Sequence, residues 1–525
     1  MTGTSHAVPH LRWRRSEAPD DWALLSAAPV TNQGFTENGC YLIELPSSEW
    51  SFRVDDEPLA SETGHGHWRS WRPGFYAGEV TAELCNPNGR PVATYLLDVA
   101  PDPSKSGREL FAQMLAEIWR DDPSLLLGTE PARTPIGALG ENEDPWMALS
   151  RLRRHGPSFL RALDAIRVRP RRVLRPRRAS SLLHHVRRAD RRTAVSVMRG
   201  AAAGLLLEGV DTPATPSALT RVDVPFTEET FDNAANRALL AITQAVLRRT
   251  LRLGTVLQAA TEADREEDTR TSMAARWPVR RAFLQEFEEA LRLALRRAPF
   301  PDVREASISA AGLNAISADP VYARAWGLAW RAMRHGFEGD PATERTWISP
   351  SFQVYEAWCF VRLARLLEEV APEWHWSPGK ADSRRWIGHT QSRRAEFKYQ
   401  RAFPAHGEPQ SGYWSISRYR IPDMVLTVES PEERRFLVFD AKYRTSRANV
   451  LDAMASAHIY QDSLRFADQR PWASLLLVPA AGGAPHLEST TFLDAHRVGV
   501  CEFSPESSDV VKRLISRFLS DQSLG

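Results

Sequence analysis

The sequence predicts a multidomain α+β protein whose parts differ in their patterning. Short apolar runs separated by turn residues, such as CYLIEL and PVATYLLDV, fill the first hundred residues. Apolar residues at helical spacing dominate a long segment from Phe226, and a strand–turn–strand pattern follows an apolar helix in the last third. A chain of 525 residues is too long for one compact domain. Its 43% hydrophobic and 25% charged residues are typical of globular proteins.

These patterns divide the chain into four expected segments. Residues 1–105 form a β-rich N-terminal domain, whose tryptophans we assign to the core rather than to a base-stacking platform. Residues 106–225 form a mixed, Arg-rich segment, and residues 226–335 form an antiparallel helical hairpin or arm. Thirty helical residues would make that arm roughly 45 Å long. Residues 340–525 form an α/β domain that contains the strand–turn–strand pattern.

Composition excludes several classes of protein. The four cysteines are scattered without a C-x-x-C pair, so we expect reduced thiols rather than disulfides or zinc. No run of eighteen apolar residues occurs, and the N-terminus lacks the apolar core of a signal peptide. We therefore expect a cytoplasmic protein without a membrane partner.

The net charge of +2 hides a strongly basic stretch. Residues 151–199 contain sixteen arginines and two acids, a formal charge of +14. Arginine at this density suits the phosphate backbone of nucleic acid. The alternative is docking against an acidic surface of the same chain, such as residues 262–268. We expect the prolines of residues 151–199 to break this basic stretch into short pieces. We predict nucleic-acid contacts for seven of its arginines: Arg171, Arg172, Arg175, Arg177, Arg178, Arg187 and Arg188.

The strand–turn–strand pattern of residues 421–444 carries the most chemistry. Its two apolar strands are joined by a short charged turn, and each strand carries an acid, Asp423 in the first and Asp440 in the second. A hairpin folded at their midpoint, 431.5, places the two acids opposite each other, with Cβ atoms about 5 Å apart. Lys442 shares that face because side chains repeat every two residues along a strand.

Two carboxylates and one ammonium should therefore converge between covered strands. The strands are apolar on both faces, as central strands are, and two buried carboxylates repel each other. Lys442 offsets one charge, and a hard divalent cation such as Mg²⁺ offsets both. Lys442 would then orient or deprotonate the attacking water, or stabilise charge on a phosphate. The alternative is an ordinary hairpin whose acids lie at exposed strand ends beside a surface salt bridge.

Pro422-Asp423, sixteen intervening residues and Asp440-Ala441-Lys442 resemble the PD-(D/E)XK motif of Mg²⁺-dependent nucleases. The resemblance implies a restriction-endonuclease-like α/β domain. It also implies that Asp423, Asp440 and the Ala441 carbonyl hold the metal, with Mn²⁺ as a substitute for Mg²⁺.

The same superfamily usually takes a third acid from a helix that precedes the hairpin. SFQVYEAWCFVRLARLLEEV predicts such a helix, with Ser349 as N-cap and Pro350 at N1. Glu356 lies on its apolar stripe, so we assign Glu356 as a catalytic residue that binds a second ion or a bound water. The alternative is that Glu356 pairs with an arginine.

A helix after the hairpin and a rival motif complete the candidates. NVLDAMASAHIYQDSLRFAD carries four polar candidates that support the metal shell, contact phosphate or pack behind the site: His458, Tyr460, Gln461 and Asp462. Glu396-Phe397-Lys398 is also an acid-x-Lys motif. It lacks an upstream Pro-Asp and a symmetric partner strand, so we interpret it as a core strand with a basic rim.

Upstream features extend the resemblance. FDNAANR before a long helix, the Arg-rich run and YEAWCF are similar to a bacterial family that joins a domain of unknown function to a McrC-like PD-(D/E)XK nuclease. Ala235 departs from that pattern, where glutamate is expected. The resemblance implies the cleavage subunit of a modification-dependent restriction or anti-phage system, which engages a McrB-like AAA+ NTPase through its N-terminal part. The sequence contains no G-x-x-x-x-G-K-[ST] phosphate loop, so nucleotide-driven movement would come from that partner.

The expected function is therefore Mg²⁺-dependent DNA endonuclease activity. Two alternatives stay open: a non-cleaving DNA-binding adaptor that docks a motor protein, and an RNA-cleaving effector that uses the same acids. The residues specify neither an oligomeric state nor a recognised sequence.

Overall fold

The computed structural model describes residues 10–126, 128, 133–135, 144–182, 185–199, 221–266, 273–334, 345–379, 382–406, 412–480 and 483–520. Two compact units divide the chain. The first unit comprises Met1–Ser150, Ala259–Arg280 and His335–Gly525, and the second comprises Arg151–Gln258 and Arg281–Arg334. Each unit therefore contains segments that are distant in the sequence. The Arg-rich segment predicted at 106–225 is described only in part.

The β-rich N-terminal domain is confirmed as two sheets around one core. The first sheet has the order β2 (Ala23–Leu25), β1 (Leu11–Arg15), β4 (Tyr41–Glu44), β8 (His65–Trp71), β7 (Ser61–Glu62). The second has the order β14 (Arg345–Trp347), β11 (Arg133–Pro135), β9 (Gly78–Cys85), β10 (Pro91–Ala100), β3 (Thr31–Thr36), with β5 (Ser51–Val54) and β6 (Glu57–Pro58) attached at β9. Trp13 and Trp71 are buried in the core between them, as predicted.

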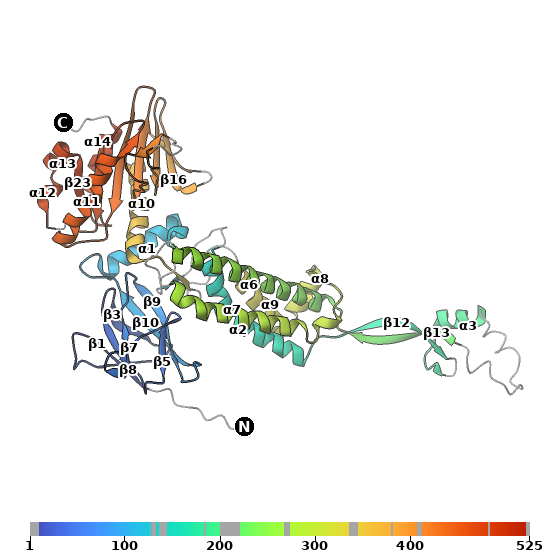
Figure 1. Cartoon of the computed structure of the whole chain (residues 1–525). Helices are drawn as coiled ribbons and strands as arrows, with labels where there is room; N and C mark the ends of the chain where they lie inside the picture. Colours follow the sequence, from blue (N-terminus) through green and yellow to red (C-terminus); the bar gives the residue numbers. More distant parts are fainter. Residues whose placement is uncertain are drawn as a thin grey trace, which may run out of the picture. The chain divides into compact units, whose positions relative to one another are not determined.

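The C-terminal domain is built on a mixed seven-stranded sheet (Figure 1). Its order is β15 (His375–Gly379), β16 (Asp382–His389), β17 (Arg394–Tyr399), β19 (Met424–Glu429), β20 (Arg434–Ala441), β22 (Ala473–Val478), β23 (Val498–Glu502). The strands are antiparallel up to β20, and β22 and β23 continue parallel to it. A short pair, β18 (Tyr413–Ser415) and β21 (Leu464–Phe466), lies outside this sheet.

Helices cover both faces of this sheet. On one face, α10 (Ser351–Val370) and α14 (Asp509–Leu519) bury side chains such as Trp358 and Phe518 against Leu426 and Leu437. On the other face, α11 (Arg447–Ser463) packs Val450 and Met454 against the sheet. Two short helices, α12 (Pro485–Glu488) and α13 (Thr490–His496), precede β23. The central strands are therefore covered on both sides, as their continuous apolar runs predicted.

Elements from the N-terminal part of the chain complete this domain. The helix α1 (Gly107–Asp121) buries Phe111, Met114 and Ile118 in the same core as α10, followed by the 3₁₀ turn η1 (Pro123–Leu126). Conversely, β14 lies directly before α10 in sequence but pairs with β11 of the N-terminal sheet. The chain therefore enters α10 directly from the sheet of the N-terminal domain.

Buried ion pairs join three segments of the first unit. Arg280 has no exposed surface and pairs with Asp55 and Asp56, at 2.8 and 3.3 Å. Trp347 of β14 also donates its indole N–H to Asp55. Because a buried charge is stable only when it is paired, these contacts hold the start of α7 and β14 against the N-terminal domain.

The second unit is mainly helical. Its helices include most of α2 (Pro145–Val168), the larger parts of α6 (Ala234–Glu266) and α7 (Met273–Leu295), and α8 (Ala310–Ser317) and α9 (Pro320–Met333), with the 3₁₀ turn η3 (Phe300–Asp302). The strands β12 (Val173–Leu182) and β13 (Arg221–Thr230) form an antiparallel ribbon, with α3 (Arg191–Arg199) at its far end (Figure 1). A helical hairpin or arm was predicted for 226–335. The helices α6 and α7 lie in that range, but its first residues, 226–230, belong to β13 instead.

The prediction that proline breaks the basic stretch into short pieces is wrong at Pro157. That residue lies inside the 24-residue helix α2. A proline inside a helix costs about 3 kcal/mol. The buried side chains of α2, among them Leu152, Phe159 and Ile166, supply packing that outweighs this cost. Pro170 lies two residues beyond the end of α2, and Pro176 lies within the edge ribbon, where proline is tolerated.

No helix in the described parts of the chain combines the length and apolar content that a bilayer crossing requires.

Candidate active site

The hairpin has the predicted register. Met424 pairs with Phe439, and Glu429 pairs with Arg434 at the turn. Each pair is symmetric about 431.5, so the same register places Asp423, which directly precedes β19, opposite Asp440 in β20. The two acids therefore lie at neighbouring ends of the central strands β19 and β20, on one face of the sheet.

Lys442 links the two carboxylates. Its Nζ lies 2.7 Å from Asp440 Oδ2 and 3.9 Å from Asp423 Oδ2. The Ala441 backbone N–H donates to Asp423 Oδ2 at 2.7 Å. The side chain of Asp440 is 2% exposed, that of Asp423 16% and that of Lys442 28%, so this is not the exposed surface salt bridge of the alternative interpretation. We call Asp423, Asp440, Lys442 and Glu356 the acid–lysine cluster.

Glu356 reaches the cluster from the second turn of α10. Gln400 Nε2 donates to Glu356 Oε1 at 2.9 Å, and the Gln400 backbone N–H donates to the Asp423 carbonyl at 2.6 Å. Gln400 therefore bridges two acid-bearing elements. It adopts φ 49°, a left-handed conformation that non-glycine residues rarely take and that is often found at functional sites. The sequence contained no signal that singled out Gln400.

The start of α10 differs from the prediction by one residue. Ser349 was expected as N-cap and Pro350 at N1, whereas the helix begins at Ser351 with Pro350 at the cap position and no side-chain cap. The Ser351 N–H, which has no partner inside the helix, instead donates to the Phe75 carbonyl of the N-terminal domain at 2.6 Å. A tertiary contact thus replaces the local cap.

Burial and repulsion between carboxylates favour the protonated forms of Asp423 and Glu356. Burial, followed by repulsion from Asp440 and Glu356, raises the pKa of Asp423 well above its ordinary value. Burial also raises the pKa of Glu356. Although burial lowers the pKa of Lys442, the charges of Asp423 and Asp440 outweigh that effect, and its net pKa is raised. Lys442 therefore stays protonated, but its single positive charge does not fully offset the burial and repulsion of Asp423 and Glu356.

The donor set fits a hard divalent cation. Asp440 Oδ1 is buried and makes no hydrogen bond, and Asp423 faces it across the hairpin. Carboxylate and carbonyl oxygens are the ligands that Mg²⁺ takes in proteins, so Asp423, Asp440 and the Ala441 carbonyl could hold it. In the described part of the chain, no three His, Cys, Asp or Glu side chains gather tightly enough to form a complete metal site by themselves.

Of the four candidates on α11, the structure brings Tyr460 to the cluster. Tyr460 is partly buried, and burial together with the charges of Asp440 and Asp423 raises its pKa. Gln461 instead donates to the Pro471 carbonyl at 2.9 Å. His458 is exposed, and Asp462 is exposed and pairs with Arg470.

Sequence reasoning missed Ser456. Its hydroxyl donates to Asp440 Oδ2 at 2.7 Å, so one oxygen of Asp440 receives both Ser456 and Lys442. The spacing of Ser456 and Tyr460 was an available signal, because residues four apart share a helix face.

The rival motif has the predicted structural role. Glu396 lies in β17 and forms ion pairs with Arg385, Arg394 and Arg401. Its carboxylate is thus neutralised by three arginines on the face of an inner strand. No second acid is placed opposite Glu396, because its partners across the strands are Ile387 and Thr427.

The N-terminal domain contacts two elements that carry the acid–lysine cluster, α10 and the segment that follows β20. The carboxylate of Glu37 is buried and accepts hydrogen bonds from the Ser351 hydroxyl of α10 and from Lys105 Nζ at 3.4 Å. Tyr443, adjacent to Lys442, shares a 2.5 Å hydrogen bond with Ser106. Lys105 Nζ also lies 4.9 Å from the centre of the Tyr443 ring. Two segments of the N-terminal part, at Glu37 and at 105–106, thus contact the helix of Glu356 and the strand end of Lys442.

The arginines predicted to contact nucleic acid lie on β12 or in the segments that flank it, and most of them bind to the chain itself. Arg172 pairs with Glu229, Arg177 with Glu228, and Arg178 with Asp190 and Asp223. Arg171 donates to the Ala315 carbonyl. The remaining three are exposed: Arg175, Arg187 and Arg188. These acidic partners are therefore those of β13 and of the α3 region. In the 262–268 segment, the side chains of 264–266 and all of 267 and 268 lie outside the described residues.

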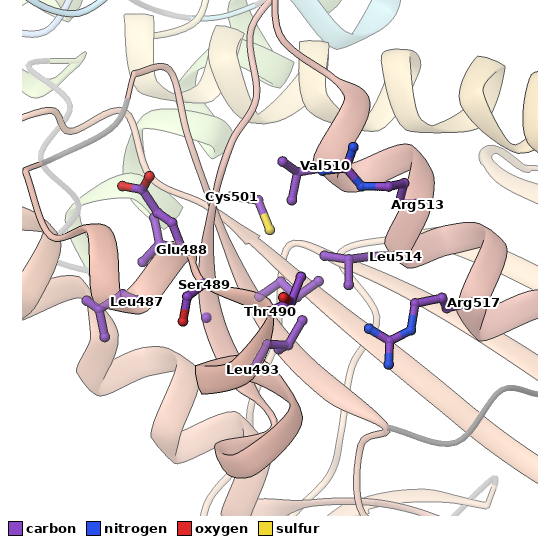
Figure 2. Close-up of a pocket in the computed structure, with 13 residues that line it drawn as sticks. Leu487, Glu488, Ser489, Thr490, Leu493, Cys501, Val510, Arg513, Leu514 and Arg517 are labelled. Carbon is purple, nitrogen blue, oxygen red and sulfur yellow. The ribbon is translucent and has the colours of Figure 1, made fainter. Parts of the chain in front are cut away.

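A separate cavity lies on the α10 and α14 side of the sheet. It has a volume of about 180 Å³ and is lined by apolar residues of β22, β23, α13 and α14, with Arg513 and Arg517 among the lining residues (Figure 2). Burial raises the pKa of Cys501 in this cavity to about 12, so its thiol is protonated at neutral pH. None of the acid–lysine cluster lines this cavity, and we do not assign it to the chemistry.

Comparison with known proteins agrees with this geometry. A sequence profile of the PD-(D/E)XK nuclease superfamily matches residues 353–470. The chain also aligns with a refined half-complex from a tetradecameric assembly of Thermococcus gammatolerans McrB AAA+ hexamers with bound McrC. That alignment covers 83% of this chain and 78% of the other at 12% identity, but its TM-score of 0.21 is too low to establish a shared fold. Among curated proteins, no sequence match is found.

The matched segment begins in the helix of Glu356 and contains the hairpin and α11. The resemblance to PD-(D/E)XK nucleases predicted from the sequence is thus confirmed for the domain that carries the cluster, and residues 353–470 belong to the PD-(D/E)XK nuclease superfamily.

Proposed function

We propose that this protein is a Mg²⁺-dependent DNA endonuclease, with Asp423, Asp440, Lys442 and Glu356 as its catalytic residues. One observation carries the proposal. Two carboxylates opposed across a buried hairpin share one lysine, and a third carboxylate approaches from α10. An arrangement that only stabilised the fold would neutralise its charges, as Glu396 is neutralised by three arginines. Here a buried carboxylate oxygen is left without a hydrogen bond.

The residues have distinct roles in hydrolysis of a phosphodiester. Lys442 carries a raised pKa and is partly exposed, so its ammonium can donate to the attacking water or to a phosphate oxygen. Ser456 holds Asp440 in place, and the Ala441 N–H holds Asp423. Gln400 orients Glu356, and burial raises the pKa of Glu356, which makes its carboxylate a stronger proton acceptor than an exposed one. When bound at Asp423 and Asp440, Mg²⁺ would neutralise the paired carboxylates and polarise the phosphate.

The biological setting is also a proposal. The sequence resemblance to McrC-like proteins supports an effector subunit of a bacterial restriction or anti-phage system. A McrB-like AAA+ NTPase would then be the partner that supplies nucleotide-driven movement. DNA is the proposed substrate because the sequence resembles McrC-like proteins of restriction systems. The exposed Arg175 of β12, and Arg187 and Arg188 beyond its end, can add phosphate contacts.

The test is cleavage of supercoiled plasmid by the purified full chain, with Mg²⁺ and with EDTA. Asp440→Asn should abolish cleavage while the chain stays folded, as a cooperative thermal transition would show. Glu396→Gln is the matched control, because it makes the same carboxylate-to-amide change on the same sheet outside the cluster. Cleavage by the wild type and by Glu396→Gln, but not by Asp440→Asn or in EDTA, is the expected result.

Equal cleavage by wild type and Asp440→Asn would contradict the assignment of the site. The RNA alternative is tested by a matched single-stranded RNA in the same assay. If no substrate is cut by the chain alone, the assay is repeated with a McrB-like NTPase and GTP or ATP. Specific DNA binding without cleavage under that condition as well would favour the adaptor alternative.

A further inference from the structure

Residues Ile416 to Ile421, which we call the 416–421 loop, expose an unusual amount of apolar surface. Ile416 is 46% exposed, Tyr419 54% and Ile421 44%. Among the described residues of the C-terminal domain, these are three of the six large hydrophobic side chains that are exposed; the others are Phe352, Leu451 and Ile459. Half of these six exposed side chains thus fall within six consecutive residues.

The 416–421 loop lies beside the strand ends that carry the acid–lysine cluster. The strand β17 ends at Tyr399, β19 begins at Met424 and β20 ends at Ala441. Since neighbouring strands among these three are antiparallel, the end of β17, the start of β19 and the end of β20 lie side by side. Ile421 is two residues before Asp423, so their Cα atoms are at most roughly 7 Å apart.

The backbone of the loop is fixed at both ends. The Ile416 N–H donates to the Ser463 carbonyl at the end of α11, at 2.9 Å. Arg420 and Phe403 exchange two backbone hydrogen bonds, at 2.8 and 3.0 Å. The exposed side chains therefore project from an anchored segment, and their exposure does not result from a loose backbone.

Two arginines accompany the apolar side chains. Arg418 is exposed, and Arg420 is partly buried with its Nε lacking a hydrogen bond. Arg420 is also close enough to Tyr460 to act electrostatically on its hydroxyl, beside Asp440 and Asp423. A guanidinium group beside the acids matches the negative charge of a phosphate chain that passes over the cluster.

We propose that the 416–421 loop contacts the bases next to the cleaved phosphate, with Tyr419, Ile416 and Ile421 packed against an unstacked base step and Arg418 and Arg420 on the flanking phosphates. The inference rests on the proposed function and narrows its substrate class to nucleic acid that is locally unstacked at the cleavage site. Aromatic and aliphatic side chains do open base steps in this way, and stacking on an aromatic ring does not depend on the base.

Affinity should depend on how easily the DNA opens. A paired duplex must spend energy on unstacking, whereas a mismatch is already partly open. The chain should therefore bind a mismatched duplex more tightly than a perfect duplex of the same length. Loss of one stacked aromatic ring should weaken binding about 5- to 100-fold. Removal of Tyr419 should also remove the preference for the mismatch, because the Tyr419 ring is the group that packs against the opened base step.

The experiment uses the full chain carrying Asp440→Asn, which should bind without cutting. Fluorescence anisotropy with Mg²⁺ measures its affinity for a labelled perfect duplex, the same duplex with a central mismatch, and the single strand. Tyr419→Ala and Tyr419→Phe are then added to this chain. Trp330→Ala is the matched control, because Trp330 is an aromatic residue of similar exposure, 59%, on α9 outside the C-terminal domain.

We expect Tyr419→Ala to lose affinity and the mismatch preference, while Tyr419→Phe and Trp330→Ala keep both. Equal binding by the Tyr419→Ala chain and its parent would overturn the inference and leave the loop as a surface for a protein partner. That result would leave the proposed function intact. A parent chain that binds none of the three DNAs, either alone or with a McrB-like NTPase and nucleotide, would overturn the proposed function, and this inference with it.

Discussion

The acid–lysine cluster and the ribbon of β12 and β13 both concentrate charge, but they handle it in opposite ways. The cluster brings a few charges, mainly negative, together at the buried ends of central strands. One buried oxygen of Asp440 makes no hydrogen bond there. The ribbon spreads many arginines over an exposed surface, and Arg172, Arg177 and Arg178 pair with acids of their own chain. Charge density alone therefore does not identify a site.

Solvent accounts for this difference. An exposed ion pair contributes about 0–1 kcal/mol and is easily exchanged for a ligand, so the ribbon can release its acids in favour of phosphate. In the buried cluster, uncompensated charge is expensive and is tolerated where it has a function. Substitutions in the cluster should therefore change the chemistry, and substitutions in the ribbon should change affinity. The following predictions test that contrast, from the largest expected effect to the smallest.

The first prediction concerns Lys442→Arg. Arginine keeps the positive charge but spreads it over a planar guanidinium that is too large for a place 2.7 Å from Asp440 and 3.9 Å from Asp423. We expect plasmid cleavage to fall by about 10³-fold, as for loss of a group that stabilises charge in the transition state. The thermal midpoint should stay near that of the wild type. Lys398→Arg, in the rival motif, is the control and should cut normally. If Lys442→Arg retained activity, Lys442 would only balance charge.

The second prediction concerns the ribbon. Arg175, Arg187 and Arg188 are exposed, so each can reach a phosphate without first breaking an ion pair that the structure describes. Each phosphate contact contributes about 0.9 to the slope of log affinity against log salt. Changing all three to alanine should reduce that slope by about 3 and weaken DNA binding by about 100-fold near physiological salt. Cleavage at saturating DNA should be unchanged, which separates this effect from that of Lys442.

Two exposed residues paired with acids provide the comparison for this measurement. Arg172→Ala and Arg177→Ala should change the salt slope less, because their phosphate contacts would compete with Glu229 and Glu228. Equal slopes for the triple variant and the wild type would show that the ribbon does not bind DNA.

The contrast also explains what could be predicted from the sequence. The register of Asp423 and Asp440 followed from symmetry about one turn, which is a local property of a hairpin. The role of Glu396 followed from the lack of a partner acid. By contrast, Gln400 and Ser456 are polar residues on ordinary elements, and only the folded sheet brings them to the acids.

Long-range packing set the remaining limits. The helix α2 passes through Pro157 because its buried face outweighs a local preference. The N-terminal contacts of α10 join residues more than 300 positions apart, such as Glu37 and Ser351, and no local pattern encodes such a pair. The acids that pair with the ribbon arginines lie on β13 and near α3, which composition alone could not distinguish from 262–268.

The third prediction concerns Glu37, which should position the catalytic helix from the N-terminal domain. Glu37→Gln weakens its bonds to Ser351 and Lys105, and Glu356 lies five residues along the same helix. We expect the cleavage rate at saturating DNA to fall about tenfold with little change in DNA affinity, since misplacement of a catalytic group costs rate. A double-mutant cycle with Ser351→Ala should show coupling of about 0.5–3 kcal/mol in stability. Additive effects would mean that the contact does not link the two domains.

The last prediction concerns stability, where the cluster should reverse the usual effect of losing a native side chain. The pKa of Asp423 is raised by burial and repulsion, so at a pH between its ordinary and raised values the folded state binds more protons than the unfolded state. The free energy of unfolding must therefore fall as pH rises through that window. In EDTA at neutral pH, Asp423→Asn should raise the thermal midpoint by about 2–4 °C and flatten its pH dependence. In Mg²⁺ the order should reverse, because the cation stabilises the ionised folded site. Thermal melts across pH in both buffers measure this. A lower midpoint for Asp423→Asn in EDTA would mean that the bonds of Asp423 to Ala441 and Lys442 outweigh the repulsion, which would favour a structural salt bridge over a metal site.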